Sequence, residues 1–212
     1  IAFKGTKRRT ARGIAEEIEA VGGHLNAYTG REQTAYCVRI LKNDVPLAVD
    51  LLADILQESV FDPEELEREQ DVIIQEIGQA LDTPDDLVFD RMQAAAYPDQ
   101  PMGRPILGTV ETVSAMTPEI LRGHMRRNYR ANDMVLSAAG AVDHDALVKM
   151  AEDKFGGLGP ALSKNQQPAV WRGGDAREEK ELEQVHLVLG FEGVAYGDPD
   201  YYAAQVFSTV LG

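Results

Sequence analysis

The chain has a single cysteine, Cys37, among its 212 residues. One cysteine can form no disulfide within the chain, and it excludes a zinc site built from several thiolates. Cys37 falls in an apolar, strand-like stretch, where a buried structural thiol is the common outcome. The scarcity of thiols fits a reducing compartment, so we expect a cytoplasmic protein.

Basic residues are also scarce, because 21 Lys and Arg face 35 Asp and Glu, giving a formal net charge of −14. This balance argues against nucleic acid as the main partner, since phosphate binding needs a basic surface. It suits a basic peptide, although acidity can equally serve solubility alone. No apolar run approaches the ~18 residues that span a bilayer, so we expect no membrane span.

Apolar periodicity predicts alternating helices and strands along the chain. Helix starts such as Asp62-Pro63, Thr117-Pro118 and Asp143 carry an N-cap residue, and Asp44 is predicted to cap another helix. The strands come partly as hairpins, which predicts an α+β fold with helices packed on a mostly antiparallel sheet. The predicted helices cover residues 10–21, 44–59, 63–82, 83–96, 117–129, 143–156 and 198 onward, and the predicted strands cover 24–29, 34–41, 132–142 and 184–193, with exposed loops at 97–108 and 157–183.

Two acids interrupt the apolar side of the predicted helix 63–82. On a helical wheel of about 100° per residue, Glu69 and Glu76 fall between Val72 and Ala80, two turns apart on one stripe. A carboxylate there loses hydration, which is costly unless a cation or hydrogen-bond donors compensate. A bound metal ion would compensate the negative charge of both acids. From periodicity alone, however, the simpler explanation is that one or both acids lie at the margin of the apolar face and pair with Arg or Lys.

A family resemblance helps to choose between a metal site and ion pairs for Glu69 and Glu76. Phe3-Lys4-Gly5-Thr6, Asn26-Ala27-Tyr28-Thr29, the Glu69 to Glu76 stretch and 103–109 occur in an order that resembles the M16 zinc peptidases. This family includes pitrilysin, insulysin and mitochondrial processing peptidase, and the resemblance extends to the β subunit of that peptidase and to its bacterial relatives. The resemblance implies an M16-like domain over 1–212 and weakens only from about 162 to 183.

The resemblance also implies a zinc site of which this chain holds a part. In the family, the segment similar to Phe3-Lys4-Gly5-Thr6 directly follows an inverted zinc motif, H-x-x-E-H. Glu76 then matches the third zinc ligand, and Glu69 matches an acid that supports the site from outside the coordination sphere. The 212 residues contain no H-x-x-E-H, so we expect a piece of a longer protein, with this motif upstream of Ile1 and a second homologous half downstream. One carboxylate cannot hold catalytic zinc, so we expect these residues alone to bind no Zn²⁺ and to be inactive.

The strand with Asn26, Ala27, Tyr28 and Thr29 is the second candidate site. In the family, the similar edge strand receives an extended peptide substrate by β-addition. Backbone groups would then give affinity, and Asn26 would position the scissile carbonyl. An ordinary hairpin strand without a binding role is the alternative.

None of the four histidines forms a convincing metal pair with another histidine or an acid. We interpret His24, His124, His144 and His186 as structural or surface residues, with His24 the least certain because it adjoins the Asn26 strand.

Two functions follow from the resemblance. The first is the N-terminal domain of a zinc endopeptidase that cuts extended, preferentially basic peptides, completed by a second M16 half, a partner subunit or a homodimeric copy. The second is a non-catalytic subunit that binds substrate or scaffolds a complex. Retention of Glu69 and Glu76 favours the peptidase, since an inactive subunit has no need of them.

Overall fold

A computed structural model describes residues 1–160 and 167–212, so the predicted loop at 157–183 lies partly outside the described residues. The chain divides into two compact units. The first comprises Ile1–Ile77 with Ile106–Gln166, and the second comprises Gly78–Pro105 with Gln167–Gly212. In the described part of the chain, no helix combines the length and apolarity that crossing a membrane requires.

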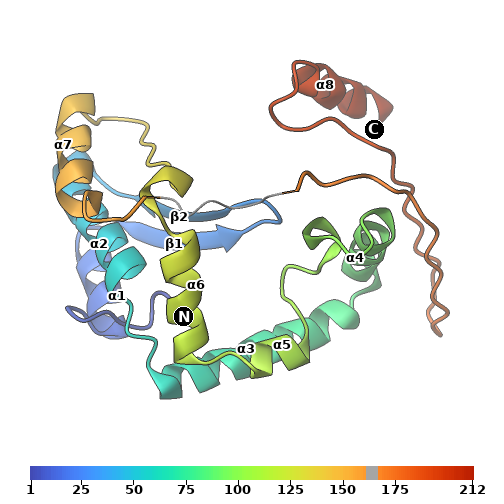
Figure 1. The fold of residues 1–212 in the computed structure, drawn as a ribbon, viewed down its shortest axis with the longest axis horizontal. Helices are drawn as coiled ribbons and strands as arrows, with labels where there is room; N and C mark the ends of the chain where they lie inside the picture. The colour runs from blue at the N-terminus through green and yellow to red at the C-terminus, as the bar shows by residue number, and fades with distance from the viewer. Residues whose placement is uncertain (161–166) are drawn as a thin grey trace. The chain divides into compact units, whose positions relative to one another are not determined.

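A β-hairpin is central to the first unit. Strands β1 (His24–Thr29) and β2 (Thr34–Arg39) pair antiparallel (Figure 1). Both are rich in β-branched and aromatic residues, which suit a pleated surface. The Gly30 N–H donates to the Gln33 carbonyl at 2.7 Å and closes the turn. The predicted hairpin is therefore confirmed.

Two helices supply the core that supports the hairpin. Helix α1 (Ala11–Ala20) contacts both α2 (Val45–Glu58) and β1, and a short 3₁₀ turn, η1 (Lys42–Asp44), leads into α2. The apolar stripes of α1 and α2 face each other, and their burial removes four large side chains from water, each worth about 1.5–3 kcal/mol of transfer free energy. The core residues are Ile14, Ile18, Leu51 and Ile55.

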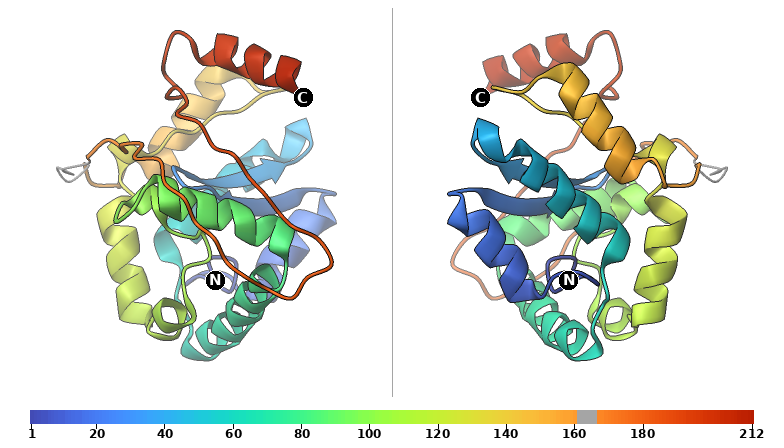
Figure 2. Two further views of the ribbon diagram at one scale, coloured as in Figure 1. Left: turned by 90° about the vertical axis from the view of Figure 1, so that its right-hand side faces the viewer. Right: turned by 90° about the vertical axis from the view of Figure 1, so that its left-hand side faces the viewer.

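Longer-range elements complete the first unit. Helix α3 (Pro63–Leu81) starts where Asp62 Oδ1 accepts from the Glu64 N–H at 2.9 Å, as its capping sequence predicts. Helix α7 (His144–Phe155) packs beside α2 (Figures 1 and 2). The remaining elements of this unit are α5 (Val110–Ser114), α6 (Pro118–Asn128) and the 3₁₀ turn η3 (Ala131–Asp133), while the end of α3 from residue 78 belongs to the second unit.

The second unit is organised around α4 (Pro84–Ala96). Two extended stretches run along this helix (Figure 2), and the Arg172 N–H donates to the Ala96 carbonyl at 2.9 Å. Tyr97 and Trp171 pack edge to face at 5.7 Å between ring centroids. This unit also contains the 3₁₀ turn η2 (Pro101–Gly103) and α8 (Tyr201–Leu211).

Two predicted strands are wrong. Within the described part of the chain, residues 132–142 and 184–193 form no β-sheet hydrogen bonds with another strand. The only paired strands among the described residues are β1 and β2. Most apolar residues of the two stretches are exposed to water, and Val135 and Val185 are 94% and 95% exposed. A strand needs a hydrogen-bonded neighbour, and neither stretch has one within the described ranges. The α+β class still holds.

Two smaller predictions are wrong, and one short helix was missed. Cys37 is exposed, because Tyr36 and Val38 take the inner face of β2 and turn Cys37 outward. Asp44 lies in η1 and makes no side-chain capping bond to α2. Helix α5 was not predicted, although Thr109 forms a capping box with Thr112 at its start.

Candidate metal centre and substrate strand

Glu69 and Glu76 lie two turns apart on α3, as the helical wheel predicts, but their surroundings differ. Glu69 is half-buried and Glu76 is exposed. The prediction that both carboxylates are desolvated therefore fails for Glu76. The reason is that the apolar arc of α3 is covered only in part, since Ile77 is buried while Val72 is 47% exposed.

Glu69 is held by a lysine from the start of the chain. The Lys4 ammonium lies 2.9 Å from Glu69 Oε1, and the Ile1 amine lies 3.5 Å from Oε2. Burial raises the pKa of Glu69, whereas the hydrogen bond and the positive charge of Lys4 lower it. The structure thus bears out for Glu69 the ion-pair alternative that periodicity favours, and it identifies the partner.

Glu76 is different, because no hydrogen bond or ion pair to its carboxylate exists within residues 1–160 and 167–212. An exposed carboxylate without a partner keeps all its lone pairs for a cation or for water. Of the two acids, Glu76 is therefore the one available as a metal ligand.

The donor chemistry fits zinc only in part. Carboxylate oxygen is an accepted zinc ligand, and a catalytic site needs three protein ligands. Among the described residues, no group of three or more His, Cys, Asp and Glu side chains could hold a metal ion. Glu76 can supply one ligand, and the others would have to come from outside these residues.

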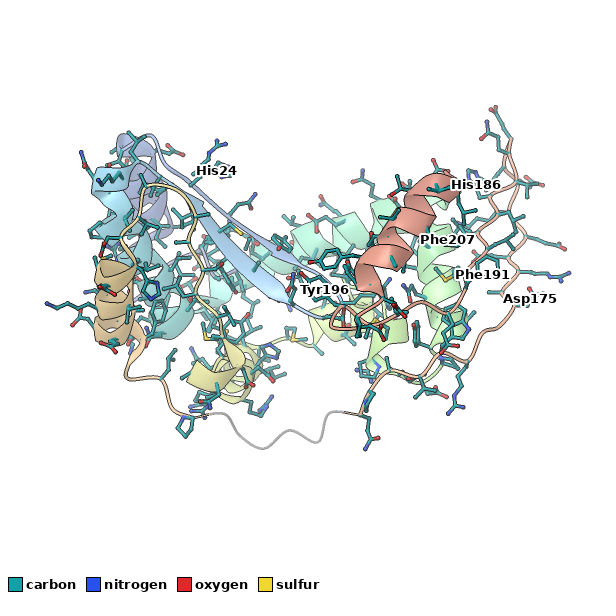
Figure 3. The ribbon with its side chains drawn as sticks, turned by 90° about the horizontal axis from the view of Figure 1, so that it is seen from above. His24, Asp175, His186, Phe191, Tyr196 and Phe207 are labelled. Carbon is teal, nitrogen blue, oxygen red and sulfur yellow. The ribbon has the colours of Figure 1, made fainter. Side chains whose placement is uncertain are left out.

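The positions of the four histidines agree with the predicted surface or structural roles. His24 starts β1 with an exposed side chain (Figure 3), and His144 is exposed at the start of α7. His124 Nδ1 lies 3.2 Å from Asn128 Nδ2 on α6. His186 Nδ1 lies 2.7 Å from Asp85 Oδ1 in the second unit.

The predicted substrate strand presents polar groups to solvent. In β1, Asn26 and Tyr28 point outward while Ala27 is half-buried, and Tyr28 is 56% exposed. The Asn26 side-chain carbonyl accepts from the Ala27 N–H at 2.8 Å, which leaves its Nδ2 group available to donate. On the side away from β2, the strand has no sheet neighbour among the described residues, so this edge can accept another strand.

A charge network that sequence reasoning did not single out fixes the start of the chain on α2. Asp54 is 2% exposed and its Oδ2 accepts from Thr6 Oγ1 and from Arg9 Nη1, each at 2.8 Å. Asp50, one turn earlier, accepts from Arg9 Nη2 at 2.8 Å and pairs with Arg8. The missed signal is the position of Asp54 within the apolar stripe of α2, beside Ala53 and Ile55.

Two known proteins that are similar to this chain are described as a protease and as a peptidase subunit. A protein described as an uncharacterized zinc protease from Rickettsia felis is 44% identical over all of this chain and 52% of its own length. The mitochondrial-processing peptidase subunit beta of Saccharomyces cerevisiae is 41% identical over all of this chain and 47% of its own length. The chain thus spans about half the length of the curated relatives it matches.

Solved structures agree on the fold. A protease from Helicobacter pylori superposes with a TM-score of 0.72 at 18% identity, covering 81% of this chain and 42% of that one. A peptidase M16 inactive domain from Pseudomonas fluorescens gives the same TM-score at 20% identity, covering 79% of this chain and 42% of its own. Both support the α+β fold of this family.

The family assignment rests on two matched segments. Residues 1–110 match the family model described as insulinase (peptidase family M16), and residues 115–212 match the model described as the peptidase M16 inactive domain. The first match covers more than half of the chain. The chain therefore belongs to the M16 peptidase family.

Proposed function

We propose that the full-length protein to which these residues belong is a zinc-dependent endopeptidase that cuts extended peptides. The observation that carries the proposal is the contrast on α3: Glu76 has no partner within the described residues, while Glu69 is engaged by Lys4. Membership of the M16 family and the zinc protease description of the Rickettsia relative support it.

In this proposal Glu76 is a zinc ligand and Glu69 supports the site from outside the coordination sphere. Bound zinc would supply Lewis acidity and an activated water. The remaining ligands, two histidines, and the general-base glutamate would come from an H-x-x-E-H segment preceding Ile1, since residues 1–212 contain none. Residues 1–212 alone would then be inactive and bind no zinc tightly.

The chain's own contribution to substrate binding would be the outer edge of β1. A peptide added there gains main-chain hydrogen bonds and is held extended. Asn26 Nδ2 is placed to donate to a peptide carbonyl, and Tyr28 offers an exposed ring beside it. The net charge of −14 would favour basic peptides through long-range attraction.

A second M16 half would complete the substrate chamber. It would come from further residues of the same protein, from a partner subunit or from a second copy. The yeast relative is named as a subunit, which fits an assembly of more than one chain.

A non-catalytic role is the second candidate, and one observation favours it. Residues 115–212 match a model described as an inactive domain. In this alternative the exposed edge of β1 would bind peptide or a neighbouring subunit without cleavage, and Glu76 would be an ordinary surface acid.

The zinc content of the full-length protein decides between them. We expect about one zinc per chain in the unmodified protein and a small fraction of that in a Glu76→Gln variant, because an amide is a far poorer zinc ligand than a carboxylate. Glu67→Gln is the matched control, since Glu67 is exposed on the same helix and lies on its polar face. Unchanged zinc in Glu76→Gln would refute the ligand role, and absence of zinc and of cleavage in the unmodified protein would support the non-catalytic alternative.

A further inference from the structure

Lys4 forms an ion pair between two segments that are far apart in the sequence. Its Nζ lies 2.9 Å from Glu69 Oε1 and 4.0 Å from Glu65 Oε2, so it meets two acids one turn apart on α3. The Lys4 and Glu69 side chains are 37% and 23% exposed. A pair with this degree of burial is screened less by water than a pair on the open surface.

A neighbouring lysine shows the contrast. Lys7 pairs with Glu58 at the end of α2, and there the side chains are 74% and 40% exposed. Exposed pairs of this kind contribute little to stability or to position. The two lysines lie three residues apart in one segment, but only Lys4 joins this segment to α3 by an ion pair.

The segment that carries Lys4 is itself fixed on its other side. Thr6 donates to buried Asp54 on α2, and the Val60 N–H donates to the Gly5 carbonyl at 3.2 Å. Lys4 therefore projects from backbone that is anchored to α2, and its ion pair with Glu69 joins α3 to that anchor. The Ile1 amine contact involves a chain end, whereas the Lys4 side chain makes its contact in a chain of any length.

We propose that Lys4 is a positioning residue for the metal site: by holding Glu69, it keeps α3 in place and leaves Glu76 as the carboxylate that binds the metal. This inference rests on the proposed function. Glu76 lies two turns beyond Glu69, about 10 Å along a rigid helix, so a shift at Glu69 is passed to Glu76. Pairing also keeps Glu69 from competing with Glu76 for the cation.

The expected size of the effect follows from other metal sites. Removing a residue that orients a ligand from outside the coordination sphere typically weakens metal binding by about 10–100-fold. Because Lys4 acts through one further residue and one helix, we expect the lower end of this range.

The test measures the zinc dissociation constant of the full-length protein by competition with a chelator. Lys4→Met should weaken zinc binding about tenfold, with about one zinc per chain still bound at saturation. Lys4→Arg keeps the charge and should restore most of the affinity. Lys7→Met is the matched control and should bind zinc as the unmodified protein does. Circular dichroism checks that each variant is folded.

A double-mutant cycle separates positioning through Glu69 from a general loss of structure. Glu69→Gln alone should weaken zinc binding by about the same factor, and adding Lys4→Met to it should change little further. Unchanged affinity in Lys4→Met, or equal losses in the presence and absence of Glu69, would overturn the role of Lys4. A full-length protein that binds no zinc would instead overturn the proposed function, and this inference with it.

Discussion

The Arg9 guanidinium donates through Nη1 to Asp54 Oδ2 at 2.8 Å, and the Asp54 side chain is completely buried. Arg9 itself is only 10% exposed, and the same carboxylate oxygen accepts from Thr6. Removing one partner of a buried pair leaves the other charge uncompensated, which is far more costly than losing an exposed pair.

Replacement of Arg9 by methionine should therefore be strongly destabilising. We expect Arg9→Met to lower the free energy of unfolding of the full-length protein by about 3–5 kcal/mol, measured by urea denaturation. Arg12→Met serves as the control, because Arg12 pairs with Glu16 on the surface of α1 with both side chains well exposed. A loss in Arg9→Met no larger than that in Arg12→Met would mean that Thr6 and Arg8, whose Nε lies 3.9 Å from Asp54 Oδ1, compensate Asp54 without Arg9.

Acid sensitivity should trace to Asp50. The Arg8 guanidinium, with further donors from Arg9 and Lys154, holds the pKa of Asp50 well below its ordinary value despite partial burial. A carboxyl whose pKa is depressed by folding stabilises the protein fully above its unfolded pKa of about 3.9 and loses that contribution as the pH falls toward the folded pKa.

We therefore expect the thermal midpoint of the unmodified protein to fall below about pH 4, and Asp50→Asn to show a lower midpoint at neutral pH with a shallower acid decline. Asp153→Asn should retain the unmodified profile, since the Asp153 side chain is 72% exposed and, among the described residues, forms an ion pair only with the neighbouring Lys154. Parallel acid declines in Asp50→Asn and the unmodified protein would contradict the assignment.

The substrate role of β1 can be tested at Asn26. The Asn26 side chain is exposed, so Asn26→Ala should leave the thermal midpoint nearly unchanged. If Nδ2 donates to the substrate carbonyl, its loss removes one hydrogen bond of about 1 kcal/mol and should lower kcat/KM for an extended peptide roughly five- to tenfold. Asn43→Ala in the exposed η1 turn is the control, and equal activity of both variants would remove Asn26 from the binding site.

The helices and the hairpin follow from neighbouring residues. Asp62, Thr117 and Asp143 each accept a backbone N–H at the start of the helix that they were predicted to cap. Such contacts span three residues, so the local sequence contains both partners. The hairpin follows for the same reason, because a short turn joins its two strands.

The stretches at 132–142 and 184–193 show where local pattern fails. A strongly apolar run at 132–142 and an alternating pattern at 184–193 indicate that each segment can pair, but not that a partner strand lies beside it. In the described part of the chain neither stretch has such a partner, and most of their apolar side chains remain exposed. Figure 3 shows Phe191 in the second of these stretches and Phe207 on α8, and their side chains are 83% and 63% exposed.

The sequence by itself determined the family, the α+β class and the shared stripe of Glu69 and Glu76, because each depends on residue order or helical period. Tertiary structure decided which acid is engaged. Lys4 lies close enough to α3 to pair with Glu69, whereas Glu76 has no hydrogen-bond or ion-pair partner among the described residues. An ion pair depends on the distance between two charged groups, which their separation in the sequence does not define.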